Sequence, residues 1–201
     1  MLVLGVNTAT SISQIALVEH EVILTENSWI SEQNESEKLL PELQKMLTES
    51  GKTWKDLEKL VVIQGPGPFT ALRVSIAVVN ALSYGLKIPI IGIPVVDYWK
   101  YRLDGDFVLY AGLNRVHFRG NLESFDDVLE KIRPNAKFSG HLKENQIKAL
   151  TKRGAKWIDE NELPTFGSFI SSLKEDYEEK SLIEPQYFAP PHITKSKKAY
   201  K

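Results

Sequence analysis

The sequence contains no cysteine, which excludes disulfide bonds, thiolate metal sites and cysteine nucleophiles together. It also lacks an excess of either charge, because 25 lysines and arginines stand against 26 aspartates and glutamates. Domains that wrap nucleic acid usually carry a clear basic excess, so this balance argues against that class. The basic residues that do cluster lie near the C-terminus and could contact RNA phosphates or only water; they are Lys195, Lys197, Lys198 and Lys201.

Long apolar runs are missing as well. No uninterrupted stretch approaches the roughly 20 residues that a helix needs to cross a bilayer. The short apolar start, Met1 to Val6, lacks the basic leader of a signal peptide. Apolar residues still make up 42% of the 201 residues, which is enough for one large domain or two small ones. We therefore predict a globular, cytoplasmic protein.

The first hundred residues predict strands that are followed by alternating helices and strands. Three extended segments with short links favour an antiparallel meander. Apolar residues at helical spacing, separated by continuous apolar runs, then favour helices and buried strands in alternation. The expected elements span 2–6, 12–19, 21–29, 36–50, 60–63, 70–86 and 88–93. This β-β-β-α-β-α-β order is characteristic of the ribonuclease H-like half of actin-like ATPases and sugar kinases, an analogy of fold alone.

The second half predicts a smaller α/β lobe. We expect a hairpin of 107–113 and 116–122, a helix over 125–132, a strand over 154–158 and a helix over 165–177. The last residues, from Glu184, are expected along the surface or disordered. The predicted fold is therefore α/β with two lobes, of which the second is reduced. The first lobe spans 1–97, and the second lobe with the tail spans 98–201.

A loop of glycine and proline precedes the second long helix. Residues 65–70 read Gly-Pro-Gly-Pro-Phe-Thr. Free N–H groups at a helix N-terminus could receive an anion, which makes Gly65, Gly67 and Thr70 a possible nucleotide loop. Each proline, however, removes one N–H donor, and no lysine follows as in a Walker loop. A rigid turn from strand to helix is the alternative.

The helix over 70–86 is apolar around most of its circumference. Arg73, Ala77, Asn80 and Tyr84 share one narrow stripe, and the other positions are almost all apolar or small. A helix needs only one apolar face to cover a sheet, so a second face must be buried elsewhere, in this chain or against another. The candidate interface residues are Leu39, Leu40, Leu43, Met46, Leu47, Ala71, Leu72, Ser75, Ile76, Val79 and Leu82.

Several segments resemble the TsaB family. Residues 65–75, Gly-Pro-Gly-Pro-Phe-Thr-Ala-Leu-Arg-Val-Ser, are similar to the family's Gly-Pro-Gly-Ser-Phe-Thr-Gly-Leu-Arg-Ile-Gly. Residues 4–10 resemble its Leu-Ala-Ile-Asp-Thr-Ala-Thr, and residues 184–187 resemble its Glu-Pro-Xaa-Tyr. Residues 36–41 and 88–93 resemble the start of its first helix and the strand after its second. The resemblance covers 2–93 well and the rest in patches.

The resemblance implies an actin-like fold and a subunit without catalytic residues of its own. TsaB proteins pair with the catalytic paralogue TsaD, and with the ATPase TsaE, in a complex that transfers threonylcarbamoyl to the adenosine beside the tRNA anticodon. ATP and a divalent metal are expected in that complex, with no cofactor on this chain alone. Pairing would use the helices near 36–50 and 70–86, and homodimers through the same surface are implied too.

This sequence departs from the family pattern at four positions. Asn7 stands where the family has Asp, Pro68 where it has Ser, and Ala71 and Ser75 where it has Gly. An asparagine cannot act as a general base or hold a metal by charge. Larger residues at 71 and 75 alter how closely a partner helix can pack.

Catalysis by this chain has little support in the sequence. Residues 1–18 contain no carboxylate to organise a divalent metal. The histidines are His20, His117, His141 and His192, and none forms the His-x-x-x-His pair of a helical metal site. We expect His117 to be structural or exposed, and His20 and His141 to lie at the surface. The alternatives to a partner subunit are a catalytic actin-like ATPase, kinase or peptidase relative, and a homodimeric structural protein outside the pathway.

Overall fold

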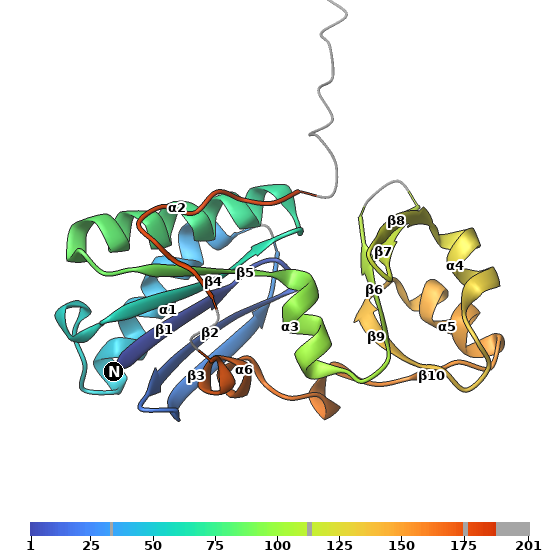
Figure 1. The fold of residues 1–201 in the computed structure, drawn as a ribbon, viewed down its shortest axis with the longest axis horizontal. Coiled ribbons are helices and arrows are strands. Elements are labelled where there is room, and N and C mark those ends of the chain that lie inside the picture. Colours follow the sequence, from blue (N-terminus) through green and yellow to red (C-terminus); the bar gives the residue numbers. More distant parts are fainter. Residues whose placement is uncertain (33, 112–113, 175–176, 188–201) are drawn as a thin grey trace, which may run out of the picture.

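The computed structural model describes residues 1–32, 34–111, 114–174 and 177–187. Two lobes lie side by side, each built on one sheet (Figure 1). The six-stranded sheet of the first lobe has the order β11-β5-β4-β1-β2-β3, and the five-stranded sheet of the second has the order β10-β9-β6-β7-β8.

The alternating segments at the start of the chain form the first sheet as predicted. β1, β2 and β3 are an antiparallel meander, and β4 and β5 add to β1 in parallel. β11 pairs with the outer edge of β5. The strands are β1 (Leu2–Asn7), β2 (Ile12–Glu19), β3 (Val22–Ile30), β4 (Lys59–Gly65), β5 (Ile90–Pro94) and β11 (Glu179–Lys180). The predicted fold class, with its β-β-β-α-β-α-β order, is confirmed.

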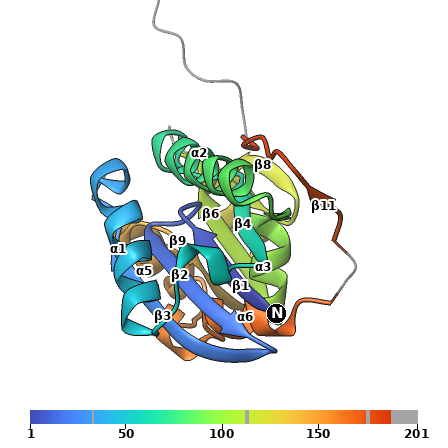
Figure 2. The same cartoon turned by 90° about the vertical axis from the view of Figure 1, so that its left-hand side faces the viewer.

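Helices cover both faces of this sheet (Figure 2). They are α1 (Glu35–Glu49), α2 (Phe69–Leu86), α3 (Val95–Arg102) and α6 (Phe166–Ser172), with a short 3-10 helix, η1 (Trp54–Asp56). Because side chains alternate along a strand, neighbouring residues enter different cores. Leu4 packs with α1 and α2, whereas Val3 belongs to the core formed with α3 and α6.

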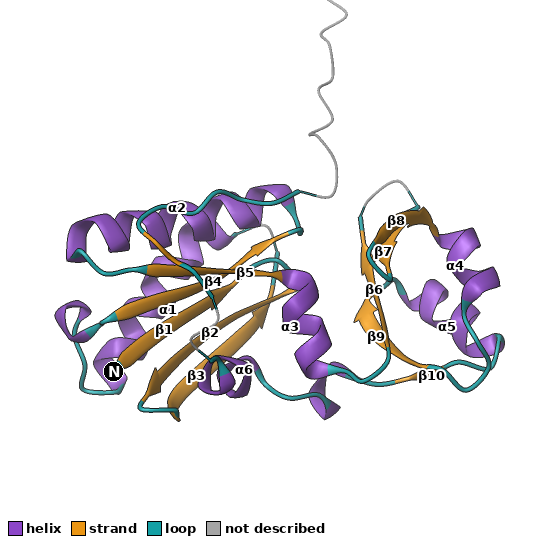
Figure 3. Ribbon diagram, viewed as in Figure 1, coloured by secondary structure: helices purple, strands orange, loops and turns teal. Residues whose placement is uncertain are grey.

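The second lobe carries its helices on the side of its sheet that faces away from the first lobe (Figure 3). Val108, Phe118 and Phe138 on the strands pack there with Val128 and Leu150 on the helices. The elements are β6 (Asp106–Tyr110), β7 (Arg115–Phe118), β8 (Asn121–Ser124), α4 (Phe125–Lys131), β9 (Lys137–His141), α5 (Glu144–Lys152) and β10 (Lys156–Trp157). A 3-10 helix, η2 (Glu160–Glu162), follows on the return to the first lobe.

The structure divides the chain between the two lobes differently from the single boundary expected at residue 97. The chain returns to the first lobe after β10, where α6 packs on β1, β2 and β3 and β11 extends the sheet. The expected strand over 116–122 is two strands, because the chain turns at Arg119 and Gly120, which both have positive φ. The expected helix over 165–177 ends at Ser172, and residues 175 and 176 lie outside the described residues.

Among the described residues, one helix, α2, is long and apolar enough to cross a membrane when only its length and composition are considered. The core helix of a water-soluble fold passes the same test. Ile76 and Val79 of α2 are almost completely buried in the core beneath it, and Leu72 is buried in the core that includes α3 and α6. This packing is that of a core helix with a second, partly open face.

Candidate partner-binding surface

The outer sides of α1 and α2 form a groove of about 660 Å³. It is lined by Leu40, Pro41, Gln44, Trp54, Ala81, Leu82, Gly85 and Leu86. Leu40 is 48% exposed, so apolar surface here is open to water. An exposed apolar patch between packed helices is typical of a protein–protein contact.

Small and rigid residues shape this groove. Ala81 and Gly85 lie one turn apart on α2, and a Cβ added at Gly85 would meet no atom within 4 Å. The Trp54 indole N–H donates to the Gln44 side-chain oxygen at 2.6 Å, which fixes the ring at the edge of the groove. A partner helix could therefore approach α2 closely, beside a fixed aromatic wall.

The predicted interface residues divide into two groups. Nine of them are buried inside this chain, with exposed fractions of 4% or less: Leu39, Leu43, Met46, Leu47, Ala71, Leu72, Ser75, Ile76 and Val79. The other two, Leu40 and Leu82, line the groove. The buried residues are thus those that attach α1 and α2 to the sheet and to each other, and a partner can reach only the outer sides.

The polar stripe of α2 binds the C-terminal segment of the chain. We name residues 181–187 the C-terminal strap; it runs along α2 (Figure 1). The Asn80 side chain donates to the Ile183 carbonyl oxygen and accepts from the Ile183 N–H, both at 2.9 Å. The Ile183 side chain is 4% exposed and belongs to the core beneath α2. The strap therefore buries part of the second face of α2 within the chain.

An aromatic and guanidinium cluster holds the end of the strap at the start of α2. The Phe69 and Tyr187 rings lie 4.9 Å apart, and the Arg73 guanidinium lies 4.0 Å from the centre of the Phe69 ring. Arg73 Nε donates to the Tyr187 hydroxyl at 3.1 Å. The Gln186 N–H donates to the Gln64 carbonyl at 2.7 Å, so residues expected along the surface or disordered are bound here. The lysines at 195–201 lie outside the described residues.

The glycines of the Gly-Pro loop serve close backbone approach. A Cβ on Gly67 would lie 2.4 Å from the Ala9 carbonyl oxygen, and one on Gly65 would lie 2.4 Å from that of Gln186. Pro68 is the N-cap of α2, and its carbonyl accepts the Leu72 N–H. Thr70 is exposed on the first turn. These contacts account for both glycines as parts of a packed turn, and the anion-binding hypothesis remains a prediction.

Three of the four departures from the family motifs contribute to one buried polar cluster. Thr8 Oγ1 lies 2.9 Å from the Ala71 carbonyl oxygen and 2.7 Å from Ser75 Oγ. Asn7 donates to the Gln14 side chain and accepts from the Ala9 N–H, both at 2.9 Å. Asn7, Thr8 and Ser75 are 0% exposed. Within the cluster, Thr8 binds Ala71 and Ser75 of α2, whereas Asn7 binds Gln14 of β2 and Ala9.

The histidines are dispersed through the fold. Within the described residues there is no group of three or more His, Asp or Glu side chains that could hold a metal. Burial lowers the pKa of the His117 imidazole, which stacks on Phe107 in the second lobe. His141 differs from the expected surface position, because its side chain is only 12% exposed. His192 lies outside the described residues.

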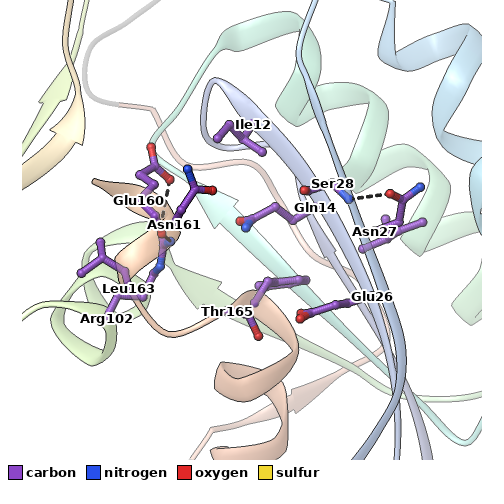
Figure 4. A pocket seen from close by; sticks show the side chains of 12 residues that line it. Ile12, Gln14, Glu26, Asn27, Ser28, Arg102, Glu160, Asn161, Leu163 and Thr165 are labelled. Atoms are coloured by element: carbon purple, nitrogen blue, oxygen red, sulfur yellow. Dashed lines mark hydrogen bonds and ion pairs between the residues drawn. The ribbon is translucent and has the colours of Figure 1, made fainter. Parts of the chain in front are cut away.

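A polar cavity of about 300 Å³ lies where the return segment meets the first sheet (Figure 4). Gln14, Glu26 and Ser28 form one wall, and Arg102 and Glu160 lie in the other. Burial raises the pKa of the Glu160 carboxyl, but the His141 imidazole 3.2 Å away and the Arg102 guanidinium outweigh this, and its pKa lies below the ordinary value.

Comparison with known proteins gives sequence matches over part of the chain. The family of TsaD, tRNA N6-adenosine threonylcarbamoyltransferase, matches residues 28–102, which include α1 and α2. The tRNA threonylcarbamoyladenosine biosynthesis protein TsaB of Buchnera aphidicola (subspecies Schizaphis graminum) is 36% identical over 98 residues, or 48% of this chain and 45% of that protein. TsaB of Escherichia coli is 30% identical over 93 residues, or 46% and 40%. Over about half of its length the chain is thus similar to TsaB proteins.

Solved structures extend the similarity of this TsaB-like chain to the second lobe. YeaZ from Pseudomonas aeruginosa superimposes with a TM-score of 0.66 at 18% identity, over 92% of this chain and 99% of that one. A Pseudomonas aeruginosa protein described as similar to peptidase YEAZ gives 0.70 at 16% identity, over 94% and 99%. At these identities the match establishes a shared fold alone. By sequence, the chain spans about half the length of the curated relatives it matches.

Sequence reasoning missed some of the surface residues. Pro41, Gln44, Trp54, Ala81, Gly85 and Leu86 line the groove but were not among the candidates. One signal was available: Ala81, Leu82, Gly85 and Leu86 recur at the spacing of one helix face. No sequence signal connects Asn80 to Ile183, which is 103 residues away.

Proposed function

We propose that this chain is a partner subunit in threonylcarbamoyladenosine biosynthesis, which binds a TsaD-like catalytic paralogue through the groove between α1 and α2. The observation that carries the proposal is the position of this open apolar groove within the segment, 28–102, that matches the TsaD family. Related folds that share such a helix pair can pack the two pairs together as a bundle, with small residues at the centre.

A TsaE-like ATPase and tRNA would join through the assembled complex, and we assign ATP and the divalent metal of the reaction to the partner subunits. Two features support this assignment. Asn7 supplies a neutral amide where a carboxylate would be needed for metal chemistry, and it is fully buried with its hydrogen bonds made by Gln14 and Ala9. A role on tRNA also makes the cytoplasm the proposed location.

Co-purification with the TsaD-like protein of the same organism tests the proposal. Leu40→Asp places a charge on the exposed rim of the groove, where the fold of the free chain should tolerate it. We expect it to weaken the complex about tenfold or more, equivalent to roughly 1.4 kcal/mol per factor of ten. Leu182→Asp is a matched control, because Leu182 is an exposed leucine on the strap, outside the groove.

The measurement has three decisive outcomes. A complex that survives Leu40→Asp at full affinity would show that the groove is not the contact. Absence of any complex with the unmodified protein, at micromolar concentration, would reject the partner role. If the free chain dimerises and Leu40→Asp prevents it, the groove's occupant is a second copy of this chain. Nucleotide hydrolysis by the isolated chain with a divalent metal would instead favour a catalytic actin-like enzyme.

A further inference from the structure

Two segments cross between the lobes, and one buried arginine binds the second of them. Arg102 lies at the end of α3, immediately before the first crossing, 103–105. Its Nε donates to the Pro164 carbonyl at 2.9 Å, and its Nη2 donates to the Glu160 carbonyl at 3.1 Å. Its Nη1 binds the Glu160 carboxylate at 3.1 Å, the contact drawn in Figure 4. The guanidinium thus fixes the return crossing, 158–165, against α3.

The same carboxylate also faces the second lobe. Glu160 Oε1 lies 3.2 Å from Nε2 of His141, which ends β9. The His141 ring meets the Trp99 ring edge-on at 5.5 Å, so α3 supports the imidazole as well. The three side chains are 3%, 16% and 12% exposed for Arg102, Glu160 and His141. One carboxylate therefore joins a helix of the first lobe to a strand of the second.

Stability alone does not explain buried charges at this position. Removing ions from water is costly, and apolar side chains of the same volume often stabilise a fold equally well or better. Charged groups with directed hydrogen bonds fix one geometry, which apolar contacts do less well. Arginine keeps its charge at every physiological pH, whereas histidine is the side chain that ordinarily gains or loses charge near neutrality. The contact of Glu160 with Arg102 therefore always joins two charges, whereas its contact with His141 joins two charges only when the imidazole is protonated.

We propose that Arg102, Glu160 and His141 form a junction clamp, in which Arg102 holds the return crossing permanently and His141 ties down the second lobe only when it is protonated. With a protonated imidazole, Glu160 pairs with a cation on each side. With a neutral imidazole, the charge attraction to β9 is lost and the second lobe is held less tightly.

Other ionisable groups around the clamp have different roles. Tyr98 on α3 lies beneath the Arg102 guanidinium, and its hydroxyl donates to Gln14 at 2.9 Å. Glu26 on β3, across the cavity, accepts the Gly167 N–H at 2.8 Å. Lys143, beyond the end of β9, is exposed. Burial raises the pKa of Tyr98, so its hydroxyl stays neutral at both pH values of the test below.

The absence of cysteine makes the test direct. Spin labels at Lys45→Cys on α1 and Glu130→Cys on α4, both exposed, would report the distance between the lobes by pulsed electron paramagnetic resonance. Measurements at about pH 5.5 and about pH 8.0 lie on either side of the ordinary histidine pKa of about 6.5. In the unmodified protein we expect a narrower distance distribution at the lower pH. In the His141→Gln variant we expect the same distribution at both pH values.

Controls separate the clamp from general effects of pH. His20→Asn changes an exposed histidine with positive φ in the first lobe and should keep the pH response. Glu160→Gln should remove the response, and it replaces His141→Gln as the test if that variant does not fold. Equal widths at both pH values in the unmodified protein, or a pH response that persists without His141, would overturn the proposal.

Discussion

Asn80 and Ile183 bind each other through two hydrogen bonds of 2.9 Å each, although 103 residues separate them in the chain. The side-chain amide of Asn80 bonds as a backbone peptide group would. Its N–H donates to the Ile183 carbonyl oxygen, and its oxygen accepts the Ile183 N–H. This relationship attaches the C-terminal strap to α2 and places Ile183 in the core beneath it.

The first prediction concerns this contact. Asn80→Ala leaves the Ile183 N–H and carbonyl without partners beside an apolar core, so we expect a loss of about 1–3 kcal/mol in the free energy of unfolding. Urea denaturation measures the loss, and amide hydrogen exchange should become faster across 181–187. Asn145→Ala, at an exposed position on α5, should have little effect on either. Unchanged exchange in the strap would contradict the role assigned to Asn80.

The second prediction concerns the buried cluster at the end of β1. Thr8→Val and Ser75→Ala each remove one hydroxyl of a pair that is 2.7 Å apart and fully buried. We expect each to destabilise the fold by about 1–2 kcal/mol, because the remaining group is left without its partner. The double variant should cost less than the sum, since both changes remove the same contact. Strict additivity in urea denaturation would show that the two hydroxyls act independently.

The third prediction compares two glycines. Gly67→Ala would bring a methyl group to 2.4 Å from the Ala9 carbonyl oxygen, so the loop must move, and we expect a loss of about 1–3 kcal/mol. Gly85→Ala adds a methyl group in open space inside a helix and should stabilise by about 0.5–1 kcal/mol. Thermal unfolding of the two variants gives the comparison. Shifts of the same sign would mean that steric contact does not set the effect at Gly67.

The fourth prediction concerns acid. The pKa of Glu160 in the folded chain lies below its ordinary value of 4.5. A lowered folded pKa contributes stability above the unfolded pKa and loses it as the pH falls through the folded pKa. The unmodified protein should therefore exceed Glu160→Gln in stability near neutral pH, with a difference that shrinks as the pH falls below 4.5. Urea denaturation at a series of pH values measures it, and a constant difference would exclude the ionised carboxylate as its source.

Most elements of the first lobe were predictable because they show strand alternation, helical spacing or a continuous apolar run. Alternation along 12–19 and the apolar run over 60–63 became β2 and β4, and helical spacing over 36–50 became α1. α3 was missed because its eight residues mix valines and aromatic residues with charges, which is too short a window for a period to emerge. β9 and α5 were missed as well.

The interface prediction shows what the spacing of apolar residues can and cannot predict. Apolar spacing showed that α2 has more apolar surface than a sheet can cover, and this surplus is present as the open groove. Spacing does not show which part of a nearly uniform circumference faces the sheet. Leu43 and Val79, two of the candidate interface residues, are both fully buried, so glutamate at either position would probe the core and not the interface. Those changes would place a charge in the core and unfold the chain.

The return of the chain to the first lobe has a consequence for the order of folding during synthesis. The second face of the first sheet is covered by α6, and Ile183 completes the core on the opposite face. Both elements are made after the whole of the second lobe, whose sheet and helices span 106–157. On a ribosome, the second lobe can therefore fold while the first is still incomplete, and the first lobe closes only when the final segment emerges. The side of α2 that binds the C-terminal strap would stay open through that interval, because residues 181–187 follow the second lobe.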